Sequence, residues 1–591
     1  MKLGRGTKSD QLNQAPCRGR GIPWWAWLAF AAALPASVGA QRAPDAGQLQ
    51  QEMDRQLRDR PAMPRVQGPA ASSGAQQSAS PAAGAGPTVT LRRVAFSGNP
   101  PLSPAELERS VASFLGRPLG FADLQRLAAT VAQRCREAGR VVRTALPPQD
   151  LGDGVLTVEV IEARFGAVRI EHQADGGPPR IDSPRLVRAV EAELKPDAPV
   201  HTRALDRALK RLEDSPGLRI TGSLAPGDRE GTTDLVLQTL NRPPVEGTYG
   251  IDNQGSRSTG SLRALASIHV ASPTGAADRL STQAMVTEGN RFLRAAYQRP
   301  WGDRGWMTGL SASALAYRLT DPALAPLEAQ GESRTLGLDL SYPLIRQTDA
   351  TLTLSALADT KRLINRAVGT TVSDYRIDSL QLAASGHRLD ESAGLRGGVT
   401  VVSVAATAGR AVLDGSPHEA SDLQGARVAG AFFKLRGTLT RQQQLTDRLS
   451  VSFSAGGQVA NRNLDSAERF QIGGSSGVRA YSASEGGGRS GYLMAVETVW
   501  VLMPKLNLTA FLDRGSVLGD RPMGTWTAPG PTRITLQGAG LGAAWSPGSG
   551  LSSRVIWARR IGRNPNPTVT GNDQDGALTI NRFWIEMGGA F

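Results

Sequence analysis

The sequence contains few cysteines, few histidines and no long apolar run. Its 591 residues contain two cysteines and five histidines, and no apolar stretch approaches the roughly 20 residues that a membrane helix needs. None of the histidines stands at a spacing typical of a metal site or of a catalytic group. These absences argue against a helical membrane protein, a disulfide-stabilised framework and a sulfur-rich metal site.

A secretory signal is predicted at residues 1–40. A basic segment precedes an apolar run at residues 22–34, and residues 38–40, Val-Gly-Ala, form a small-residue cleavage pattern. Cys17 precedes the apolar run, whereas the acceptor cysteine of a lipoprotein follows it. Removal of the signal leaves Cys135 alone in the mature chain, and its helical spacing with neighbouring apolar residues predicts a core position.

The formal net charge is +14, which by itself is compatible with nucleic-acid binding. The arginines, however, are spread along the whole chain and form no compact stripe with interleaved aromatic residues. An exported protein also does not meet nucleic acid in the cell. We therefore expect no nucleic-acid partner and assign the charge to solvated loops and to a cationic channel interior.

Residues 242–591 repeatedly alternate apolar with polar or small residues. Leu336, Leu338 and Leu340 alternate with Gly337 and Asp339. Period two places alternate side chains on one face of a strand. A long array of such strands behind a secretory signal predicts a transmembrane β-barrel. With roughly 10–12 residues in each strand and about as many in each loop, the length of residues 245–591 suits about 16 antiparallel strands. The low hydrophobic share of 40% and the 67 glycines suit a barrel with a polar interior, although a loop-rich soluble protein or a β-solenoid would also explain them.

The mature N-terminus is predicted to be a helix on a tether. Within residues 41–60, Leu49, Met53 and Leu57 recur at the spacing of one helix face. Residues 61–87 consist mainly of Pro, Ala, Gly, Ser and Gln, which is typical of a flexible linker. A short helix is marginal alone in water, so it needs a surface to pack on. The alternative is a disordered tail.

Between the tether and the barrel, the order strand, helix, helix, strand, strand occurs twice. Residues 88–163 form module 1 and residues 164–241 form module 2. A unit of about 75 residues is too short for an α/β enzyme domain. Its exposed sheet edge can accept an extended segment of another chain, which predicts a binding module.

Several motifs together point to a family. Their sequences are Phe-Gln-Ile-Gly-Gly-Ser-Ser-Gly-Val-Arg-Ala-Tyr at 470–481, Phe-Leu-Asp-Arg-Gly at 511–515, and further segments at 146–151, 160–164, 252–255 and 560–565. The order and spacing of these segments resemble those of the TpsB transporters of two-partner secretion, the haemolysin secretion/activation type (ShlB/FhaC/HecB). These belong to the outer-membrane superfamily of barrels preceded by POTRA domains, which includes the barrel-assembly proteins.

The resemblance implies a fold and a function. Modules 1 and 2 would be periplasmic POTRA domains, and residues 41–60 would form a helix that plugs the resting pore. The chain would lie in the outer membrane of a Gram-negative bacterium and secrete one unfolded exoprotein of the haemagglutinin or haemolysin type. Outer membrane lipid and the barrel-assembly machinery would be further partners, with Phe591 as the C-terminal insertion signal. No enzymatic activity and no cofactor is implied.

The resemblance also implies the site residues. The loop motif of the family is Val-Arg-Gly-Tyr, and its arginine meets the aspartate of a Phe-x-Asp motif on the barrel wall. The matching residues here are Val478, Arg479, Ala480, Tyr481, Phe511 and Asp513. A guanidinium can donate two parallel hydrogen bonds to a carboxylate, which suits such a pair. Ala480 stands where the family has glycine, and alanine adopts a positive φ only at a cost, so the geometry of the loop tip is in question.

Two other patterns suggest an enzyme or a metal site. Residues 473–477, Gly-Gly-Ser-Ser-Gly, fit the pattern of serine hydrolases, but no helix pattern follows them. The segment 571–576, which contains Asp573 and Asp575, distantly resembles a calcium loop without its ligand register or terminal glutamate. We expect the first to be a loop of the barrel and the second to be a surface loop.

Two other functions stay open from the sequence. One is a barrel-assembly factor that inserts other outer-membrane proteins, and the other is a passive porin or adhesin. The presence of two modules and of a tethered helix favours secretion over assembly. A porin would need no docking modules.

Overall fold

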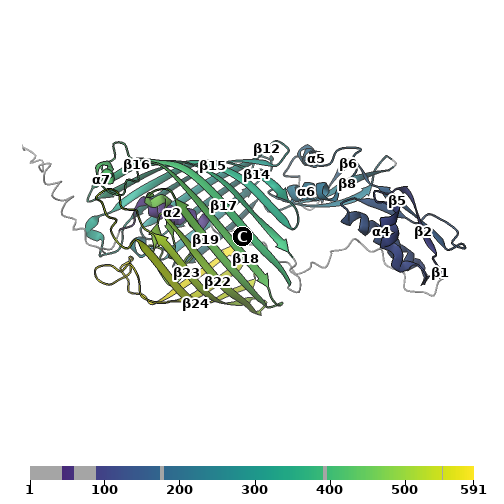
Figure 1. The fold of residues 1–591 in the computed structure, drawn as a ribbon. Coiled ribbons are helices and arrows are strands. Elements are labelled where there is room, and N and C mark those ends of the chain that lie inside the picture. Colours follow the sequence, from purple (N-terminus) through teal and green to yellow (C-terminus); the bar gives the residue numbers. More distant parts are fainter. Residues whose placement is uncertain (1–42, 59–87, 174–178, 230, 391–395, 549) are drawn as a thin grey trace, which may run out of the picture.

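The computed structural model describes residues 43–58, 88–173, 179–229, 231–390, 396–548 and 550–591. Figure 1 shows a large β-barrel, two small modules at one end of it, and a short helix within the barrel outline. In the described ranges, no helix is long and apolar enough to span a membrane. The predicted signal peptide and the predicted tether lie outside the described residues.

Sixteen strands form one closed antiparallel barrel, in agreement with the prediction. Each strand pairs with its neighbours along the chain, and β19 pairs with β22 across an intervening loop. The strands are β9 (Val245–Asp252), β10 (Arg263–Ala271), β11 (Arg279–Val286), β12 (Asn290–Trp301), β13 (Trp306–Arg318), β14 (Gln330–Arg346), β15 (Ala350–Ala367), β16 (Thr370–Asp390), β17 (Arg396–Val412), β18 (Gly430–Gln444), β19 (Leu449–Ala460), β22 (Ser490–Met503), β23 (Leu506–Leu518), β24 (Arg533–Gly548), β25 (Leu551–Arg560) and β26 (Asn581–Ala590).

The alternating sequence pattern produces two different barrel faces. Leu336 and Leu338 of β14 are more than half exposed on the outside, whereas Ser333 and Thr335 of the same strand are buried inside. Connections at the end near the modules are short, such as the one between Trp301 and Trp306. Most connections at the far end are longer, as is usual for outer-membrane barrels, although those after β11 and β15 are also short. One of the longer connections follows β17 and contains helix α7 (Glu419–Gln424). The sequence did not define where the strand before it ends, and the structure places that end at Val412.

The barrel closes between its first and last strands. Pairing of β26 with β9 extends from Glu586 opposite Asp252 to Ala590 opposite Thr248. Phe591 continues it, because its backbone exchanges two hydrogen bonds of 3.0 Å with Gly247. A Cβ atom at Gly247 would lie 2.2 Å from the Phe591 ring, so the ring needs glycine beneath it.

Module 1 packs two helices on a three-stranded sheet. Its elements are β1 (Val89–Thr90), β2 (Arg93–Asn99), α3 (Pro104–Val111), β3 (Pro118–Leu119), α4 (Phe121–Glu137), β4 (Val142–Ala145) and β5 (Val155–Glu162). The sheet order is β2-β5-β4. The first strand, which the sequence suggests as one element, is split at Leu91. Leu91 is fully buried there, and the backbone N–H groups of Arg92 and Arg93 donate to the Gly154 carbonyl.

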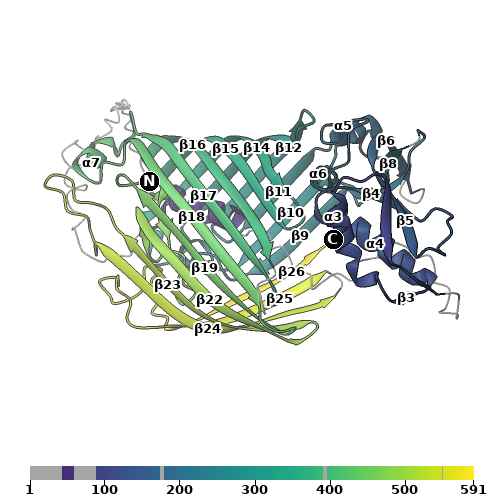
Figure 2. The same ribbon diagram turned by 45° about the vertical axis from the view of Figure 1, so that its right-hand side comes forward.

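Module 2 repeats this architecture and contacts the barrel. Its elements are β6 (Arg164–His172), α5 (Ser183–Glu191), α6 (Thr202–Glu213), β7 (Leu218–Pro226) and β8 (Thr232–Asn241), with sheet order β6-β8-β7. Arg346 of the barrel pairs with Asp214, and Thr348 Oγ1 donates to Asp206 Oδ1 at 2.8 Å. Figure 2 shows module 2 against the barrel rim and module 1 beyond it.

Helix α2 (Ala46–Arg58) lies inside the barrel, in the half away from the modules (Figures 1 and 2). It lies within the segment 41–60 in which the sequence predicts a helix, and it begins at Ala46. Leu49 and Met53 are buried, as their spacing predicts. They join an apolar cluster whose barrel members include Phe292, Leu315 and Tyr375. The interior is therefore partly apolar where the helix lies.

Candidate functional site

The connection between β19 and β22, residues 461–489, folds back between the barrel walls and is called the lumen loop here. A two-residue pairing of Phe470–Gln471 (β20) with Gly487–Gly488 (β21) closes its stem. Ile472, Val478 and Tyr481 are fully buried, and they pack with wall residues of β23 and β24. The lumen loop is thus a packed part of the barrel interior.

Arg479 of the lumen loop forms a bidentate ion pair with Asp513 of β23. Its Nε donates to Asp513 Oδ2 at 2.9 Å, and its Nη2 donates to Oδ1 at 2.6 Å. The backbone N–H of Arg479 donates to Asp513 Oδ2 at 3.0 Å, and Asp513 is fully buried. Glu497 of β22 accepts from Nη1 at 2.6 Å. Arg479 and Asp513 were expected from the family motifs, whereas Glu497 was not.

Aromatic side chains complete the environment of Arg479. Its Cζ atom lies 3.5 Å from the centre of the Phe511 ring, a cation–π contact. Trp584 Nε1 of β26 donates to the Arg479 carbonyl at 2.8 Å. Three wall strands, β22, β23 and β26, therefore hold this one loop residue.

The alanine at position 480 fits without strain. Ala480 is fully buried and does not have a positive φ, so its backbone conformation does not require glycine. The space for its methyl group comes from Gly538 of β24, where an added Cβ would lie 2.7 Å from the Ala480 Cβ. The neighbouring Tyr481 ring lies 4.5 Å from the guanidinium carbon of Arg560.

The Gly-x-Ser-x-Gly segment is a turn inside the lumen loop. Gly477 N–H donates to the Gly474 carbonyl at 2.9 Å, and Ser475 Oγ donates to Gln254 Oε1 at 2.7 Å. A Cβ at Gly473 would lie 2.2 Å from a backbone carbonyl oxygen. These glycines allow backbone segments of the lumen loop to pack closely. The segment does not form the strand-to-helix elbow that a serine hydrolase needs.

The prediction that Asp573 and Asp575 lie at the surface is wrong. Asp573 is fully buried beside Arg560, and Asp575 Oδ2 accepts from Arg582 Nη2 at 3.1 Å. These arginines come from β25 and β26, so the long connection between the two strands folds its acids onto the wall. Across the residues that the structure describes, no three His, Cys, Asp or Glu side chains gather to hold a metal ion.

Helix α2 is bonded both to the barrel wall and to the lumen loop. Ala46 N–H donates to Asn365 Oδ1 of β15 at 2.8 Å. At the same end, Asp45 Oδ1 accepts from Ser466 Oγ of the lumen loop at 2.7 Å. Towards the other end, Arg55 Nη2 donates to the Ser476 carbonyl at 2.6 Å. The helix and the loop therefore form one connected body inside the barrel.

A second group of buried charges fixes the base of the lumen loop. Glu468, in the short helix η5 (Ser466–Glu468), is 3% exposed. Its carboxylate accepts from Lys361 Nζ of β15 at 2.7 Å and from Lys434 Nζ of β18 at 2.5 Å. Arg263 and Asp252 form another buried bidentate pair, and Arg263 Nη1 also donates to Gln56 of α2 at 2.7 Å. These groups were not predicted, because their partners are scattered over distant strands.

Comparison with known proteins agrees with this architecture. Residues 231–545 match the model of the haemolysin secretion/activation proteins ShlB/FhaC/HecB, and residues 89–163 match the ShlB-type POTRA domain. The outer membrane transporter CdiB of Escherichia coli is 25% identical over 521 residues, which are 85% of this chain and 84% of that protein. The heme/hemopexin transporter protein HuxB of Haemophilus influenzae is 23% identical over 469 residues, 78% of this chain and 81% of that protein.

Solved structures show the same fold. CdiB from Escherichia coli aligns with a TM-score of 0.65 at 22% identity, covering 93% of this chain and 100% of that chain. BamA from Haemophilus ducreyi, lacking POTRA domains 1–3, aligns with a TM-score of 0.55 at 13% identity, covering 85% of this chain and 100% of that chain. The family is one of outer-membrane secretion pores with periplasmic POTRA domains. The chain belongs to the haemolysin secretion/activation protein family ShlB/FhaC/HecB, the two-partner secretion transporters of the outer membrane.

Proposed function

We propose that this chain captures one unfolded exoprotein in the periplasm and conducts it through the barrel lumen to the cell surface. In the resting state described here, α2 and the lumen loop occupy the interior, and both leave it during transport. The observation that carries this proposal is their mutual attachment: Asp45 and Arg55 bind the lumen loop at two separate points. Displacing one segment therefore loosens the other.

The attachment of α2 is weak enough to be reversible. Burial of Leu49 and Met53 contributes roughly 1.5–3 kcal/mol each. The hydrogen bonds of the helix add about 0.5–1.5 kcal/mol each, since water replaces them when the helix leaves. An entering chain has to offset only several kcal/mol. The barrel wall, in contrast, is held by a continuous ladder of backbone hydrogen bonds around its circumference.

The Arg479–Asp513 pair acts as a latch in this proposal. Breaking a fully buried ion pair costs about 3–5 kcal/mol. Once the lumen loop moves, water enters the lumen and solvates Asp513 and Glu497, which lowers the cost of opening. The latch thus favours the closed state without making it permanent.

Capture is assigned to the sheet edges of the modules. Strands β4 of module 1 and β7 of module 2 each end the order of their sheet. An unpaired edge presents backbone donors and acceptors that an extended segment can match, whatever its sequence. An unfolded exoprotein supplies such segments. We expect no nucleic-acid partner and no cofactor in this process.

Two further partners belong to the proposal. The outward leucines of the barrel face outer membrane lipid, because a barrel must present an apolar band to the membrane. The barrel-assembly machinery inserts the chain, and the exposed Phe591 ring beside β9 marks the strand that it recognises. Replacing Phe591 by alanine should lower the amount of heat-modifiable barrel in the outer membrane; an unchanged amount would remove this assignment.

The experiment that tests the function measures export in cells with and without this chain. The secretion of the protein encoded beside it is measured in the culture medium, and other outer-membrane proteins are quantified in parallel. Loss of that single export supports the proposal. A general fall in outer-membrane barrels would identify an assembly factor instead, and unchanged export would leave a porin or an adhesin.

A further inference from the structure

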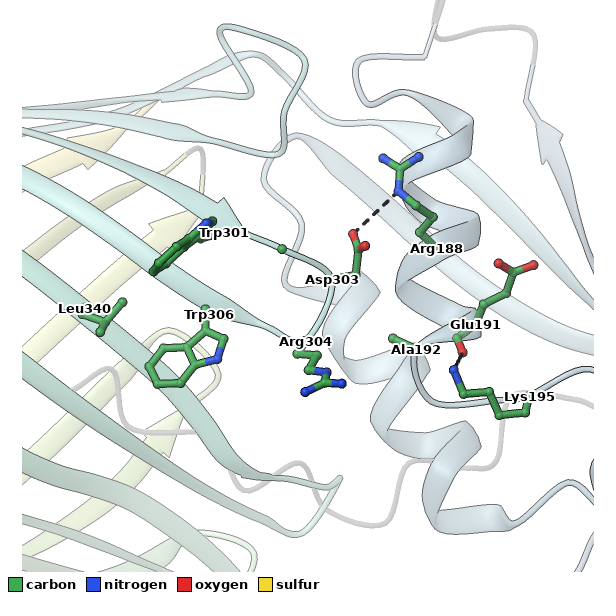
Figure 3. Close-up of a pocket in the computed structure, with 10 residues that line it drawn as sticks. Arg188, Glu191, Ala192, Lys195, Trp301, Asp303, Arg304, Trp306 and Leu340 are labelled. Atoms are coloured by element: carbon green, nitrogen blue, oxygen red, sulfur yellow. Dashed lines mark hydrogen bonds and ion pairs between the residues drawn. The ribbon is translucent and has the colours of Figure 1, made fainter.

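A groove lies at the joint between module 2 and the barrel. One of its walls is the C-terminal part of α5 with the residues that follow it, and the other is the β12–β13 turn with the outer surface of the adjoining strands (Figure 3). Its volume is about 840 Å³. The residues that carry its chemistry are Arg188, Lys195, Trp301, Arg304, Trp306 and Leu340.

The barrel wall of the groove is aromatic and apolar. Trp301 and Trp306 are paired across the turn, and their side chains are 66% and 39% exposed. The Trp306 ring lies 4.8 Å from the ring of Tyr342, centre to centre. Leu340 shares the outward face of β14 with Leu338, two residues away. Tryptophan and tyrosine at the end of an apolar band mark the depth of the lipid headgroups.

Both walls contribute positive charge, Arg304 from the β12–β13 turn and Arg188 and Lys195 from α5 and the residues that follow it. Arg304 makes no ion pair within the described part of the chain, and Lys195 Nζ donates to the backbone carbonyl of Glu191 at 3.0 Å rather than to a carboxylate. Arg188 Nε lies 3.7 Å from Asp303 Oδ1, so this arginine compensates the one acid of the turn. In Figure 3 the Glu191 carboxylate points away from the tryptophans, and the Arg304 side chain extends downward from the turn.

We propose that this groove binds an anionic phospholipid of the inner leaflet of the outer membrane. Arg304 and Lys195 would contact the phosphate, since both are cations without a competing carboxylate. The acyl chains would lie on Trp301, Trp306 and Leu340, along the apolar outer face of the barrel. The occupant is a lipid, because one wall of the groove continues into the membrane-facing surface. It is an inner-leaflet lipid, because the groove lies at the end where the periplasmic modules stand.

Such a lipid would join module 2 to the barrel. The two bodies already touch beside the groove, where Arg211 Nη1 donates to the Asp303 carbonyl at 3.0 Å and Arg185 lies against Pro300. A phosphate held between Arg304 of the turn and Lys195 after α5 adds a link that depends on the membrane composition. The lipid thereby helps to hold the capture module at a fixed place over the lumen.

The test measures lipid binding to the full-length protein in detergent by native mass spectrometry. The delipidated protein is titrated with phosphatidylglycerol, with phosphatidylethanolamine, and with inorganic phosphate as a competitor. We compare the double variant Arg304→Gln/Lys195→Gln with the control Arg448→Gln/Lys505→Gln. The control removes the same charge from exposed turns at the same end of the barrel. A heat-modifiable band establishes that each variant is folded.

The proposal predicts one retained phosphatidylglycerol that resists dilution. Near a membrane surface each cation is worth about a fivefold change in binding, so the Arg304/Lys195 variant should bind about 25-fold more weakly. The control should bind like the wild type. Equal weakening in the control, equal retention of phosphatidylethanolamine, or displacement of the lipid by inorganic phosphate would each overturn the proposal.

Discussion

At the scale of single residues, buried ion pairs fasten the lumen loop to the barrel wall. Arg479 is bound by Asp513 and Glu497, and Glu468 is bound by Lys361 and Lys434. Each group joins the lumen loop to wall strands. Because the charges are buried, removing one member leaves its partner poorly compensated.

Asp513→Asn removes the charge of the latch and keeps its shape. The variant leaves Arg479 with Glu497 as its charged partner, so the closed position of the lumen loop loses up to about 3–5 kcal/mol, less where water enters. A lumen loop without a fixed closed position also occupies positions that obstruct the lumen, so we expect reduced export with an unchanged amount of heat-modifiable barrel. Asp339→Asn is the control, since Asp339 faces the lumen from β14 and hydrogen-bonds Gln298 instead. Normal export by Asp513→Asn would exclude the latch, and loss of the barrel would make the pair structural.

Cys135 offers a probe of module 1. It is fully buried in α4, and burial raises the pKa of its thiol above the ordinary value. The thiolate is the reactive form, so alkylation of the native protein near neutral pH should be slow and should become fast when module 1 unfolds in denaturant. Mass spectrometry after timed maleimide treatment measures both rates. Rapid labelling of the native protein would contradict the assigned core position.

The sequence motifs identified Arg479 and Asp513 because both lie in compact family segments. No local signal marked Glu497, Lys361 or Arg263. Each of these is a single charged residue in an alternating strand, and its partner stands in a different strand or in the lumen loop. Asp573 and Asp575 were misplaced for the same reason, since the arginines that bury them are visible only after the barrel closes.

At the scale of elements, α2 and the lumen loop are the two segments that occupy the barrel interior, and the proposal assigns the state of the pore to them. The spacing of Leu49 and Met53 predicted the helix, and the family resemblance predicted its role as a plug. Its resting place could not be derived from the pattern, because the wall residues that receive it, such as Phe292 and Tyr375, are far apart in the sequence.

Gly47→Leu should release α2 from the lumen. A Cβ at Gly47 would lie 2.4 Å from Ser466 Oγ and 3.0 Å from the backbone nitrogen of Ala467, so a large side chain has no room. Overpacking costs about 1–3 kcal/mol, which shifts the resting equilibrium by a factor of about 5 to 150. We expect higher conductance in planar lipid bilayers.

The control introduces the same residue at the next position of the helix. Gln48 is partly exposed, so Gln48→Leu should leave the conductance near that of the wild type. Equal conductance of Gly47→Leu and wild type would mean that α2 does not limit the pore.

At the scale of the whole molecule, the barrel and the modules are separate structures. The closed strand order of the barrel includes no strand of either module. Period-two alternation predicted the barrel, since one face of each strand meets lipid and the other meets the lumen, and the length of residues 245–591 predicted about 16 strands. The placement of module 2 against the barrel was not predictable, because it rests on a few polar contacts to turns.

Removal of residues 88–163 should separate capture from pore formation. Because module 1 contributes nothing to the barrel ladder, the shortened chain should still insert and conduct ions. Export of the exoprotein should fall to background, because one of the two capture modules is missing. The heat-modifiable band, bilayer conductance and export are measured on the same strain. Normal export without module 1 would contradict its assignment.

The central claim is that the exoprotein passes through the lumen after α2 has left it. The most direct measurement places a photo-crosslinking amino acid at Phe292, which belongs to the buried apolar cluster that receives α2, and at Leu336, which faces the lipid. Without exoprotein, position 292 should crosslink to α2; during secretion it should crosslink to the exoprotein, and position 336 should do neither. A crosslink from position 292 to α2 that persists undiminished during active export, with none to the exoprotein, would contradict the account.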